Sequence, residues 1–561
     1  MTMESTLASL TAGAAAWSGR DARGRAILAR ETALAVAGAA PAWVEAAVAL
    51  KDGAAVGSTA AVVAEETATG PLATLRLLLV TARVADDIAV AGIPRAASSP
   101  RVLHPAATGS GSLVGIDVLP ALGVADRAMF GGHQATIRCS NPGDAAAFAR
   151  SWREEARDRP RRGGVAVVLG AGNVTGLPVA DAISQIFEHG RGVLLKLHPL
   201  HAPLEPVFRA ALAPLISAGL LAIVPGGADV AAAAIASPLA THVHLTGGQE
   251  AFDAIVWGGG GPRPSPAVPR LTKPVTCELG GVTPWLVVPG RYSPVELAYQ
   301  ADLIAATIAN NTSFNCIATK CVVTCRGWDQ REEFLALVVR RLESLPPRRG
   351  WYPGAAATWA AVTGLTPPAD GTLPWILRTG IDPVGEPHWL EREWFVPVAV
   401  EVPLDTIDIE TFCTHAMAFT RRLPGSLAVS VTVPPTLPPH DRQRVDLLVE
   451  HLEYGTVAVN TWSAIAYTLA NVPWGGFPGA TLAVPESGIG WVHDPLMLPL
   501  VHNSILRAPL LVRPTPPWFP WHRRGDAITR GVVDVYTALA RGRSGLWPLA
   551  RMLPAVVSGG R

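Results

Sequence analysis

Two residues of this chain could together perform covalent catalysis. Cys316 lies in the run NTSFNC (311–316), and Glu278 lies in the run CELGG (277–281). A thiol can attack a carbonyl group and carry the acyl group as a thioester, while a neighbouring carboxylate acts as the base. The glycines after Glu278 let the backbone turn tightly and bring the carboxylate into a cleft. The two runs therefore predict a catalytic pair of thiol nucleophile and carboxylate base.

Each member of this pair also has an ordinary interpretation. A free cysteine is commonly a small buried hydrophobic residue, and Glu278 could be a surface carboxylate at a strand end. Cys316, Cys321 and Cys325 could suggest a metal site, but their spacing matches none of the common zinc or iron–sulfur patterns. Strand alternation places Cys321 and Cys325 on one face as packing residues. We therefore predict no metal site.

A glycine-rich turn, GAGN (170–173), supplies a third candidate. Asn173 offers an amide donor at the end of an apolar run, and such a donor can stabilise an oxyanion. The turn lacks the full spacing of a dinucleotide fingerprint and the lysine of a phosphate loop. An asparagine in this position can also be a simple turn residue in the left-handed region.

Short apolar runs alternate with helical stretches around these residues. The pattern predicts strands over 165–169, 192–197, 220–224 and 241–245, and helices over 177–189, 204–218 and 228–236. This alternation predicts a parallel, doubly wound α/β sheet. Ligands bind at the carboxyl ends of the strands of such a sheet. The GAGN turn, Lys196 and the pair Gly247-Gly248 all lie at those ends.

The composition excludes several classes of protein. The net charge of +1 gives no reason to expect nucleic acid as a partner. Six cysteines in 561 residues do not resemble a disulfide framework. No basic residue precedes Arg20, so a secretory signal is not predicted. The uncharged run 210–228 is broken by proline and glycine, which predicts buried elements. We therefore expect a cytoplasmic protein with no transmembrane segment.

Lysine is rare in this chain, with four lysines against 42 arginines. Three of them, Lys196, Lys273 and Lys320, fall in or beside the runs described here. A compact ammonium group and a planar guanidinium group are not interchangeable at a functional site. The positions of these three lysines therefore support a specific role for the runs.

Taken in order, the runs resemble the aldehyde dehydrogenase superfamily. The matching segments, between about residues 165 and 479, are VVLGAGN, GVLLKLHP, HLTGG, KPVTCELGG, NTSFNC, EREWFVP, GTVAVN and VPWGGFPG. Each segment alone is a weak signal, but their order and spacing together are specific. The resemblance implies an α/β fold with a Rossmann-like cofactor domain, an αβ catalytic domain and an active site between them.

The resemblance also implies a role for each matching residue. Cys316 would be the nucleophile and Glu278 the base, and Asn173 would form the oxyanion hole with the Cys316 backbone N–H. The cofactor would be held by Lys196 at the adenosine ribose, Gly247 and Gly248 at the pyrophosphate, Glu393 at the nicotinamide ribose and Phe395 beside the nicotinamide. The implied reaction is oxidation of a small-molecule aldehyde to a carboxylic acid, with NAD or NADP as the cofactor, through a thiohemiacetal and a thioester.

Several positions depart from the family pattern. Gly-Asn stands in place of Pro-Trp-Asn, Ser313-Phe314 in place of Gly-Gln, Gly248 in place of serine, and Val396 in place of glycine. Pro199 stands where NAD-preferring members often have glutamate, and its neutral side chain makes NADP a plausible cofactor. Two alternatives stay open: an acyl-CoA or acyl-thioester reductase that forms an aldehyde, and an inactive scaffold in which Phe314 and Val396 fill the nicotinamide pocket.

The chain divides into three predicted segments. Residues 1–272 would form an N-terminal helical region and the dinucleotide-binding domain, and residues 273–475 the catalytic domain. Residues 476–561 would return to the cofactor domain and end in an extension rich in proline, arginine and tryptophan, with a helix over 527–541. The extension could contact a membrane surface, but its prolines interrupt an apolar face and favour packing on the protein. The resemblance implies a homo-oligomer.

Overall fold

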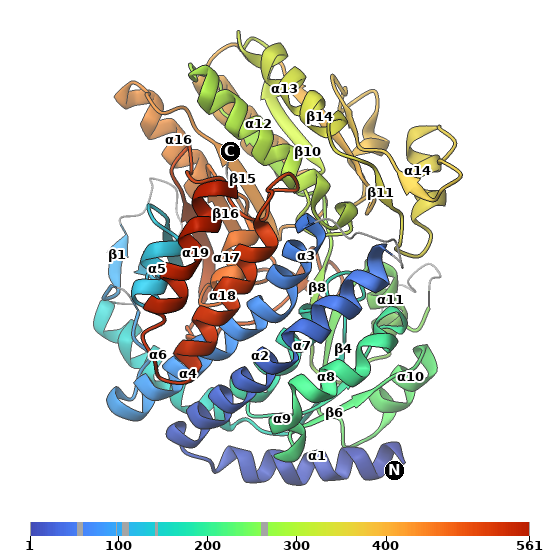
Figure 1. Ribbon diagram of the computed structural model, residues 1–561, viewed down its shortest axis with the longest axis vertical. Helices are drawn as coiled ribbons and strands as arrows, with labels where there is room; N and C mark the ends of the chain where they lie inside the picture. The colour runs from blue at the N-terminus through green and yellow to red at the C-terminus, as the bar shows by residue number, and fades with distance from the viewer. Residues whose placement is uncertain are drawn as a thin grey trace.

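The computed structural model describes residues 2–52, 60–96, 98–103, 112–140, 144–259 and 268–559 (Figure 1). Its core contains two large β-sheets with helices packed around them. The smaller sheet has six strands in the order β17-β8-β7-β4-β5-β6. These strands are β4 (Val165–Leu169), β5 (Gly192–Lys196), β6 (Leu221–Val224), β7 (His242–Gly247), β8 (Val275–Leu279) and β17 (Gly488–Ile489).

The smaller sheet confirms the predicted doubly wound arrangement. Strands β4 to β8 are parallel, and β17 pairs antiparallel with β8. The connecting helices include α7 (Leu177–Phe187), α8 (Glu205–Ala211), α9 (Ala213–Ser217), α10 (Ala228–Ala236) and α11 (Gln249–Trp257). Because β4 lies between β5 and β7, the strand order reverses there, and the carboxyl edge at such a switch point is where ligands bind.

The larger sheet has ten strands in the order β1-β2-β3-β18-β16-β15-β9-β10-β14-β13. In this order, each neighbouring pair from β18 onward to β13 is parallel. The pairs β1-β2, β2-β3 and β3-β18 are antiparallel. The strands are β1 (Arg101–Leu103), β2 (Leu113–Asp117), β3 (Gln134–Ser140), β9 (Pro284–Val287), β10 (Cys321–Cys325), β13 (Ile376–Arg378), β14 (Val398–Leu404), β15 (Ala428–Thr432), β16 (Thr456–Val459) and β18 (Val501–Arg507).

The two sheets divide the chain differently from the predicted segments. Strand β8 follows the predicted boundary at residue 273 but pairs with β7 in the smaller sheet. Strands β1 to β3 precede that boundary but belong to the larger sheet. In the last segment, β17 returns to the smaller sheet, while β18 pairs with β16 in the larger one. Apolar runs predict strands, but they do not specify which sheet a strand will join.

The N-terminal region consists of helices α1 (Met3–Ser18), α2 (Ala22–Asp52), α3 (Ala60–Thr67) and α4 (Ala73–Ala91), with a π-helical turn η1 (Ala68–Leu72). Within the described residues, one helical stretch, Ala22–Lys51, is long and apolar enough to cross a membrane. In this fold α2 packs against α4, α8 and α9. Its Trp43 is fully buried and donates a hydrogen bond to Thr175 Oγ1 at 2.9 Å. Helix α2 is therefore part of the packed body.

The C-terminal extension forms helices α18 (Gly525–Ala540) and α19 (Leu546–Gly559), so the predicted helix over 527–541 is present. Figure 1 shows α18 and α19, in red, beside the blue N-terminal helices, and α18 contacts α2, α3 and α4. The fully buried Arg76 donates to Asp126 Oδ1 at 2.6 Å and to Tyr536 Oη at 3.0 Å. The hydrogen bond from Arg76 to Tyr536 ties α18 to the body, in agreement with the packing interpretation.

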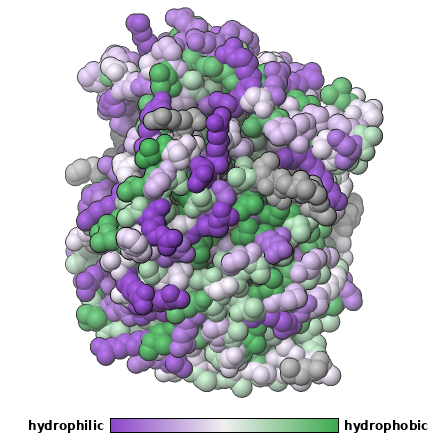
Figure 2. Space-filling model, viewed as in Figure 1, coloured by the Kyte–Doolittle hydropathy of each residue, from purple (hydrophilic) through white to green (hydrophobic). Residues whose placement is uncertain are grey.

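The outward face of α19 exposes four large apolar side chains, Leu546, Trp547, Leu553 and Val557. On the face seen in Figure 2, hydrophobic and hydrophilic residues are interspersed over the region of α18 and α19. Contact of this helix with a membrane surface stays a prediction.

Candidate active site

Glu278 comes from the smaller sheet, and Cys316 comes from the loop that leads into a strand of the larger sheet. Glu278 lies near the carboxyl end of β8, and Cys316 lies in the loop between α12 (Pro294–Ala309) and β10. The Cys316 thiol donates a hydrogen bond from Sγ to Glu278 Oε1 at 3.1 Å. The carboxylate is only 2% exposed. The predicted nucleophile and base are therefore in direct contact, in a site that is largely shielded from water.

Burial controls the proton affinities of this pair. Removal from water raises the pKa of Glu278 to about 7, and the charge of Asp181 adds to the increase. Trp474 Nε1 donates to Glu278 Oε2 at 3.0 Å and favours the ionised carboxylate. Burial, followed by the Glu278 charge, holds the pKa of the Cys316 thiol well above its ordinary value. At neutral pH a protonated thiol therefore faces a carboxyl group that can accept its proton.

The loop that carries Cys316 has an unusual backbone. In the short helix η4 (Asn310–Ser313), the φ angles of Asn311, Thr312 and Ser313 are 51°, 54° and 64°. A left-handed conformation costs an L-residue roughly 1–2 kcal/mol, and the β-branched side chain of Thr312 makes this especially unfavourable. Three such residues in succession require support from the surrounding structure.

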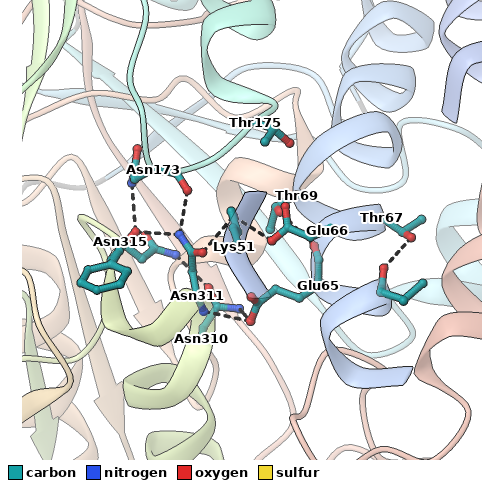
Figure 3. Close-up of polar contacts among 12 residues, drawn as sticks. Lys51, Glu65, Glu66, Thr67, Thr69, Asn173, Thr175, Asn310, Asn311 and Asn315 are labelled. Atoms are coloured by element: carbon teal, nitrogen blue, oxygen red, sulfur yellow. Dashed lines mark hydrogen bonds and ion pairs between the residues drawn. The ribbon is translucent and has the colours of Figure 1, made fainter. Parts of the chain in front are cut away.

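A buried lysine supports the loop from behind. Lys51, near the end of α2, is 1% exposed and its partner Glu66 is fully buried. Lys51 Nζ lies 2.7 Å from Glu66 Oε1 and donates to Asn311 Oδ1 at 2.9 Å (Figure 3). The ammonium group also lies 5.1 Å from the ring centre of Trp351. One cation therefore connects α2 and α3 to the first left-handed residue of the loop.

Glu65, the residue before Glu66 in α3, holds the same loop by accepting hydrogen bonds from the loop. Glu65 Oε2 accepts hydrogen bonds from Asn311 N at 2.8 Å and from Asn310 Nδ2 at 3.2 Å (Figure 3). Glu65 Oε1 accepts from Arg348 Nη1 at 3.0 Å. We refer to the five residues Lys51, Glu65, Glu66, Asn310 and Asn311 as the anchor network. Its hydrogen bonds provide the support that the left-handed loop requires.

Lys320 fixes the opposite end of the loop. Its Nζ donates to Ser313 Oγ at 2.7 Å and to the backbone carbonyl of Val396 at 2.8 Å. Burial lowers the pKa of Lys320 to about 8, while the nearby charge of Glu393 opposes this change. Lys320 therefore joins the Cys316 loop to the segment that carries Glu393 and Phe395.

Asn173 packs against the same loop. Its Nδ2 donates to the backbone carbonyl of Phe314 at 3.1 Å, and its own backbone carbonyl accepts from Asn311 Nδ2 at 2.9 Å (Figure 3). The amide thus lies against the segment just before Cys316. Its role in the oxyanion hole stays a prediction.

Phe314 belongs to an aromatic cluster. It is fully buried, and its ring centre lies 5.3 Å from that of Trp351, 5.6 Å from that of Tyr352 and 5.8 Å from that of Phe395. The predicted cofactor residue Phe395 is thus in contact with the residue that departs from the family pattern. Phe314 is not among the residues that line the cavity in front of Cys316.

The predicted cofactor residues occupy two places. Lys196 ends β5 and Gly247 ends β7, and both lie at the carboxyl edge of the smaller sheet. Gly248 caps the N-terminus of α11, and a Cβ atom there would meet no atom within 4 Å. Glu393 lies beside the catalytic pair instead, where a Cβ atom on Gly280 would be 1.8 Å from its Oε2. This close approach explains the glycine directly after Glu278-Leu279.

Two features of these residues suit a nicotinamide dinucleotide. The open backbone at Gly248 lies at a helix N-terminus, which favours an anionic phosphate. Within the described part of the chain, Glu393 Oε1 is buried and has no hydrogen-bond partner. Such an oxygen can accept hydrogen bonds from ribose hydroxyl groups. Burial raises the pKa of Glu393 to about 7, and Lys320 opposes the increase.

A cavity of about 430 Å³ opens in front of the catalytic pair. Near the thiol it is lined by Glu278, Asn315, Cys316, Tyr467 and Trp474. Aliphatic and aromatic side chains form most of the remaining wall, and several of them come from the C-terminal extension. A ligand of drug-like size can therefore reach the catalytic pair.

Cys321 and Cys325, which follow the NTSFNC run, are packing residues, as predicted. Cys321 and Cys325 are fully buried in β10. The Cys325 thiol donates to the backbone carbonyl of Thr406 at 3.0 Å.

The sequence did not reveal several residues that position the site. Lys51 and Glu66 come from the N-terminal helices, far in sequence from the loop they hold. Lys320 was noted because lysine is rare, but its partners were not predicted. Trp474 lies in the VPWGGFPG segment, which was used for the resemblance without a role for the tryptophan.

Comparison with known proteins identifies the fold. No protein-family model matches the sequence, and no curated protein matches it. The solved structure of indole-3-acetaldehyde dehydrogenase bound to NAD⁺ is 16% identical, with a TM-score of 0.57 over 90% of this chain and 88% of that chain. An NAD-dependent aldehyde dehydrogenase from Sinorhizobium meliloti is 16% identical, with a TM-score of 0.58 over 92% and 88%. A Mycobacterium tuberculosis aldehyde dehydrogenase bound to NAD⁺ is 15% identical, with a TM-score of 0.57 over 91% and 90%. The chain therefore has the fold of the aldehyde dehydrogenases.

Proposed function

We propose that this protein oxidises an aldehyde to a carboxylic acid with NAD or NADP as the cofactor. The observation that carries the proposal is the 3.1 Å contact between Cys316 Sγ and Glu278 Oε1 at the inner end of a cavity. A thiol that must form and then release a thioester needs a base at this distance. The fold and the fit of the cofactor-binding residues support the same reaction.

The first step is covalent. Cys316 Sγ attacks the aldehyde carbonyl carbon, and its proton passes to Glu278. The carbonyl oxygen becomes an alkoxide, which the Asn173 amide and the Cys316 backbone N–H stabilise. Because the anchor network and Lys320 hold the loop, Sγ and these donors keep their relative positions during the attack.

The second step releases the acid. Lys196, Gly247, Gly248 and Glu393 would hold the nicotinamide dinucleotide, which when bound accepts the hydride lost by the thiohemiacetal carbon. A thioester then remains on Cys316. Glu278, after losing its first proton to solvent, removes a proton from water, and the resulting hydroxide displaces the sulfur. The Cys316 thiolate recovers a proton from Glu278.

A cofactor and aldehyde panel on the purified protein tests this function. Aldehyde with NAD⁺ or NADP⁺ and without coenzyme A should yield the reduced cofactor and the free acid in equal amounts. If the protein instead reduces acyl-CoA and forms no acid, it is an acyl-thioester reductase. Glu278 argues against this alternative, because reduction of a thioester does not need a base that activates water.

Cofactor binding tests the inactive alternative. A scaffold would bind the cofactor but would not reduce it with any aldehyde of a broad panel. Phe314 is fully buried against Phe395, the residue that would lie beside the nicotinamide, so the binding measurement decides whether this ring leaves room for the cofactor.

A further inference from the structure

The cavity in front of Cys316 extends to the C-terminal helices. Its lining combines residues from distant parts of the chain, among them Leu72, Phe130, Leu303, Trp518, Val532 and Val556. Val532 belongs to α18 and Val556 to α19, so the extension forms part of the wall. The extension therefore contributes to the space in which a substrate would lie.

The size and character of the cavity disfavour a small substrate. Cavities of about 300–1,000 Å³ enclose ligands of drug-like size, and this one has about 430 Å³. An aldehyde of two or three carbons would leave water against most of an apolar wall. A long hydrocarbon chain would remove that water, and each methylene group it buries strengthens binding about fourfold.

The described lining of the cavity interior offers no free charged partner for a second polar group on the substrate. Among the described lining residues, Glu65 is paired with Arg348 and with the backbone of Asn311. Burial lowers the pKa of His133, which disfavours the charged form of its ring. Arg513 lies among the exposed residues of the lining. An aldehyde with a carboxylate or ammonium group at its far end would find no free partner in the interior.

The helical wall has a fixed position. Tyr536 of α18 accepts a hydrogen bond from Arg76 at 3.0 Å. Helix α19 packs closely on α18, because a Cβ atom on Gly531 would lie 2.3 Å from Met552 Cγ. Successive residues of α19 have opposite surroundings: Met552 and Val556 line the cavity, whereas Leu553 and Val557 are 60% and 65% exposed.

We propose that the substrate is a long, unbranched apolar aldehyde, and that α18 and α19 set the length of chain that the protein accepts. This proposal rests on the proposed aldehyde oxidation. The aldehyde carbon lies at Cys316, and the hydrocarbon chain extends along the apolar wall toward Val532 and Val556.

A series of straight-chain aldehydes from propanal to hexadecanal tests the substrate class. The value of kcat/KM should rise about fourfold with each added methylene group that the cavity can bury, and then reach a plateau. A maximum at propanal or butanal would contradict the proposal.

Matched substitutions on α19 test the wall. Val556→Trp should lower the ratio of kcat/KM for dodecanal to that for hexanal by at least tenfold, because the indole occupies the space of the distal methylene groups. Val557→Trp, one residue further on the exposed face, should leave that ratio within twofold. Met552→Trp and Leu553→Trp repeat the comparison if Val556→Trp does not fold. Equal ratios in both members of a pair would show that α19 does not contact the chain.

A binding measurement separates this proposal from the proposed function. A dansyl-labelled fatty acid should bind to the Cys316→Ala variant and be displaced by dodecanoic acid but not by butanoic acid. Oxidation of short aldehydes without such binding would overturn the substrate class and leave the oxidation intact. Binding without oxidation of any aldehyde would support the apolar chain site and overturn the proposed reaction.

Discussion

The two sides of the Cys316 loop have opposite chemical character. In front of the thiol lies a cavity with mostly apolar walls, in which Glu278 is the buried carboxylate beside the sulfur. Behind the loop, the anchor network packs the Lys51 ammonium and the Glu66 carboxylate between helices, and its Glu65 also reaches the wall of the cavity. The front provides a water-poor space in which proton transfer is effective. The back holds a loop whose backbone is unfavourable by itself. The charged groups of the N-terminal helices therefore position the site, and only the front carries out chemistry.

The largest expected effect concerns the nucleophile at the boundary of the two sides. Cys316→Ser should reduce aldehyde oxidation by at least about 10⁴-fold, because a serine hydroxyl is a far weaker nucleophile at neutral pH. Steady-state formation of the reduced cofactor measures this change. Cys413→Ser, the same substitution in a buried cysteine of helix α15 (Ile409–Thr420), should retain most of the activity. Substantial oxidation by the Cys316→Ser variant would remove this thiol from the mechanism.

Breaking the anchor network should have the next largest effect, on both stability and kcat. Lys51→Met leaves the buried carboxylate of Glu66 without its cation, which should lower the free energy of unfolding by about 3–5 kcal/mol. In the fraction that stays folded, kcat should fall about 100-fold, because the loop no longer holds Sγ in place. Denaturant unfolding and active-site titration measure the two effects separately.

An exposed ion pair provides the control for Lys51. Arg421 and Glu453 lie 2.9 Å apart with side chains 53% and 49% exposed. Arg421→Met should change the free energy of unfolding by less than about 1 kcal/mol. If Lys51→Met lowers the free energy of unfolding by no more than Arg421→Met does, the anchor network does not hold the loop.

The pH dependence should report the carboxyl group in front of the thiol. Because Glu278 acts as the base only when ionised and its pKa is about 7, kcat/KM should fall about tenfold per pH unit below that value. Above it, the rate should level off. A profile with no inflection between pH 6 and 8 would exclude Glu278 as the base.

A smaller change should sharpen this assignment. Trp474 Nε1 donates to Glu278 Oε2 and favours the ionised form. Trp474→Phe removes that hydrogen bond, so the inflection should move upward by about one pH unit. Its position in a pH–rate profile of the variant measures the effect, and a downward shift would contradict the stated role of the indole.

Local sequence patterns predicted the front of the site better than the back. The apolar runs at 165–169 and 192–197 became β4 and β5, and the thiol and carboxylate runs came into contact. These features depend on short segments with clear periodicity. The sheet to which β8 belongs depends on pairing between strands that are distant in sequence, so the domain boundaries were less predictable.

The anchor network illustrates why the rest was not predicted. Lys51 and Glu66 lie on helices whose spacing predicts only an amphipathic pattern, and their partner Asn311 is 260 residues from Lys51. The C-terminal wall of the cavity is a similar case. The prolines of the extension favoured packing on the protein, but only the three-dimensional structure identifies Val532 and Val556 as lining residues.

Pre-steady-state kinetics of the Glu278→Gln variant test the central claim most directly. The claim is that Glu278 supplies the base that frees the acid from Cys316. The variant should form about one equivalent of reduced cofactor per active site in a rapid burst, best seen at high pH where the thiol ionises unaided. Its steady-state rate should then fall by about 10²–10⁴-fold, because the thioester accumulates. A steady-state rate equal to that of the unmodified protein would show that another group activates water and would contradict this account.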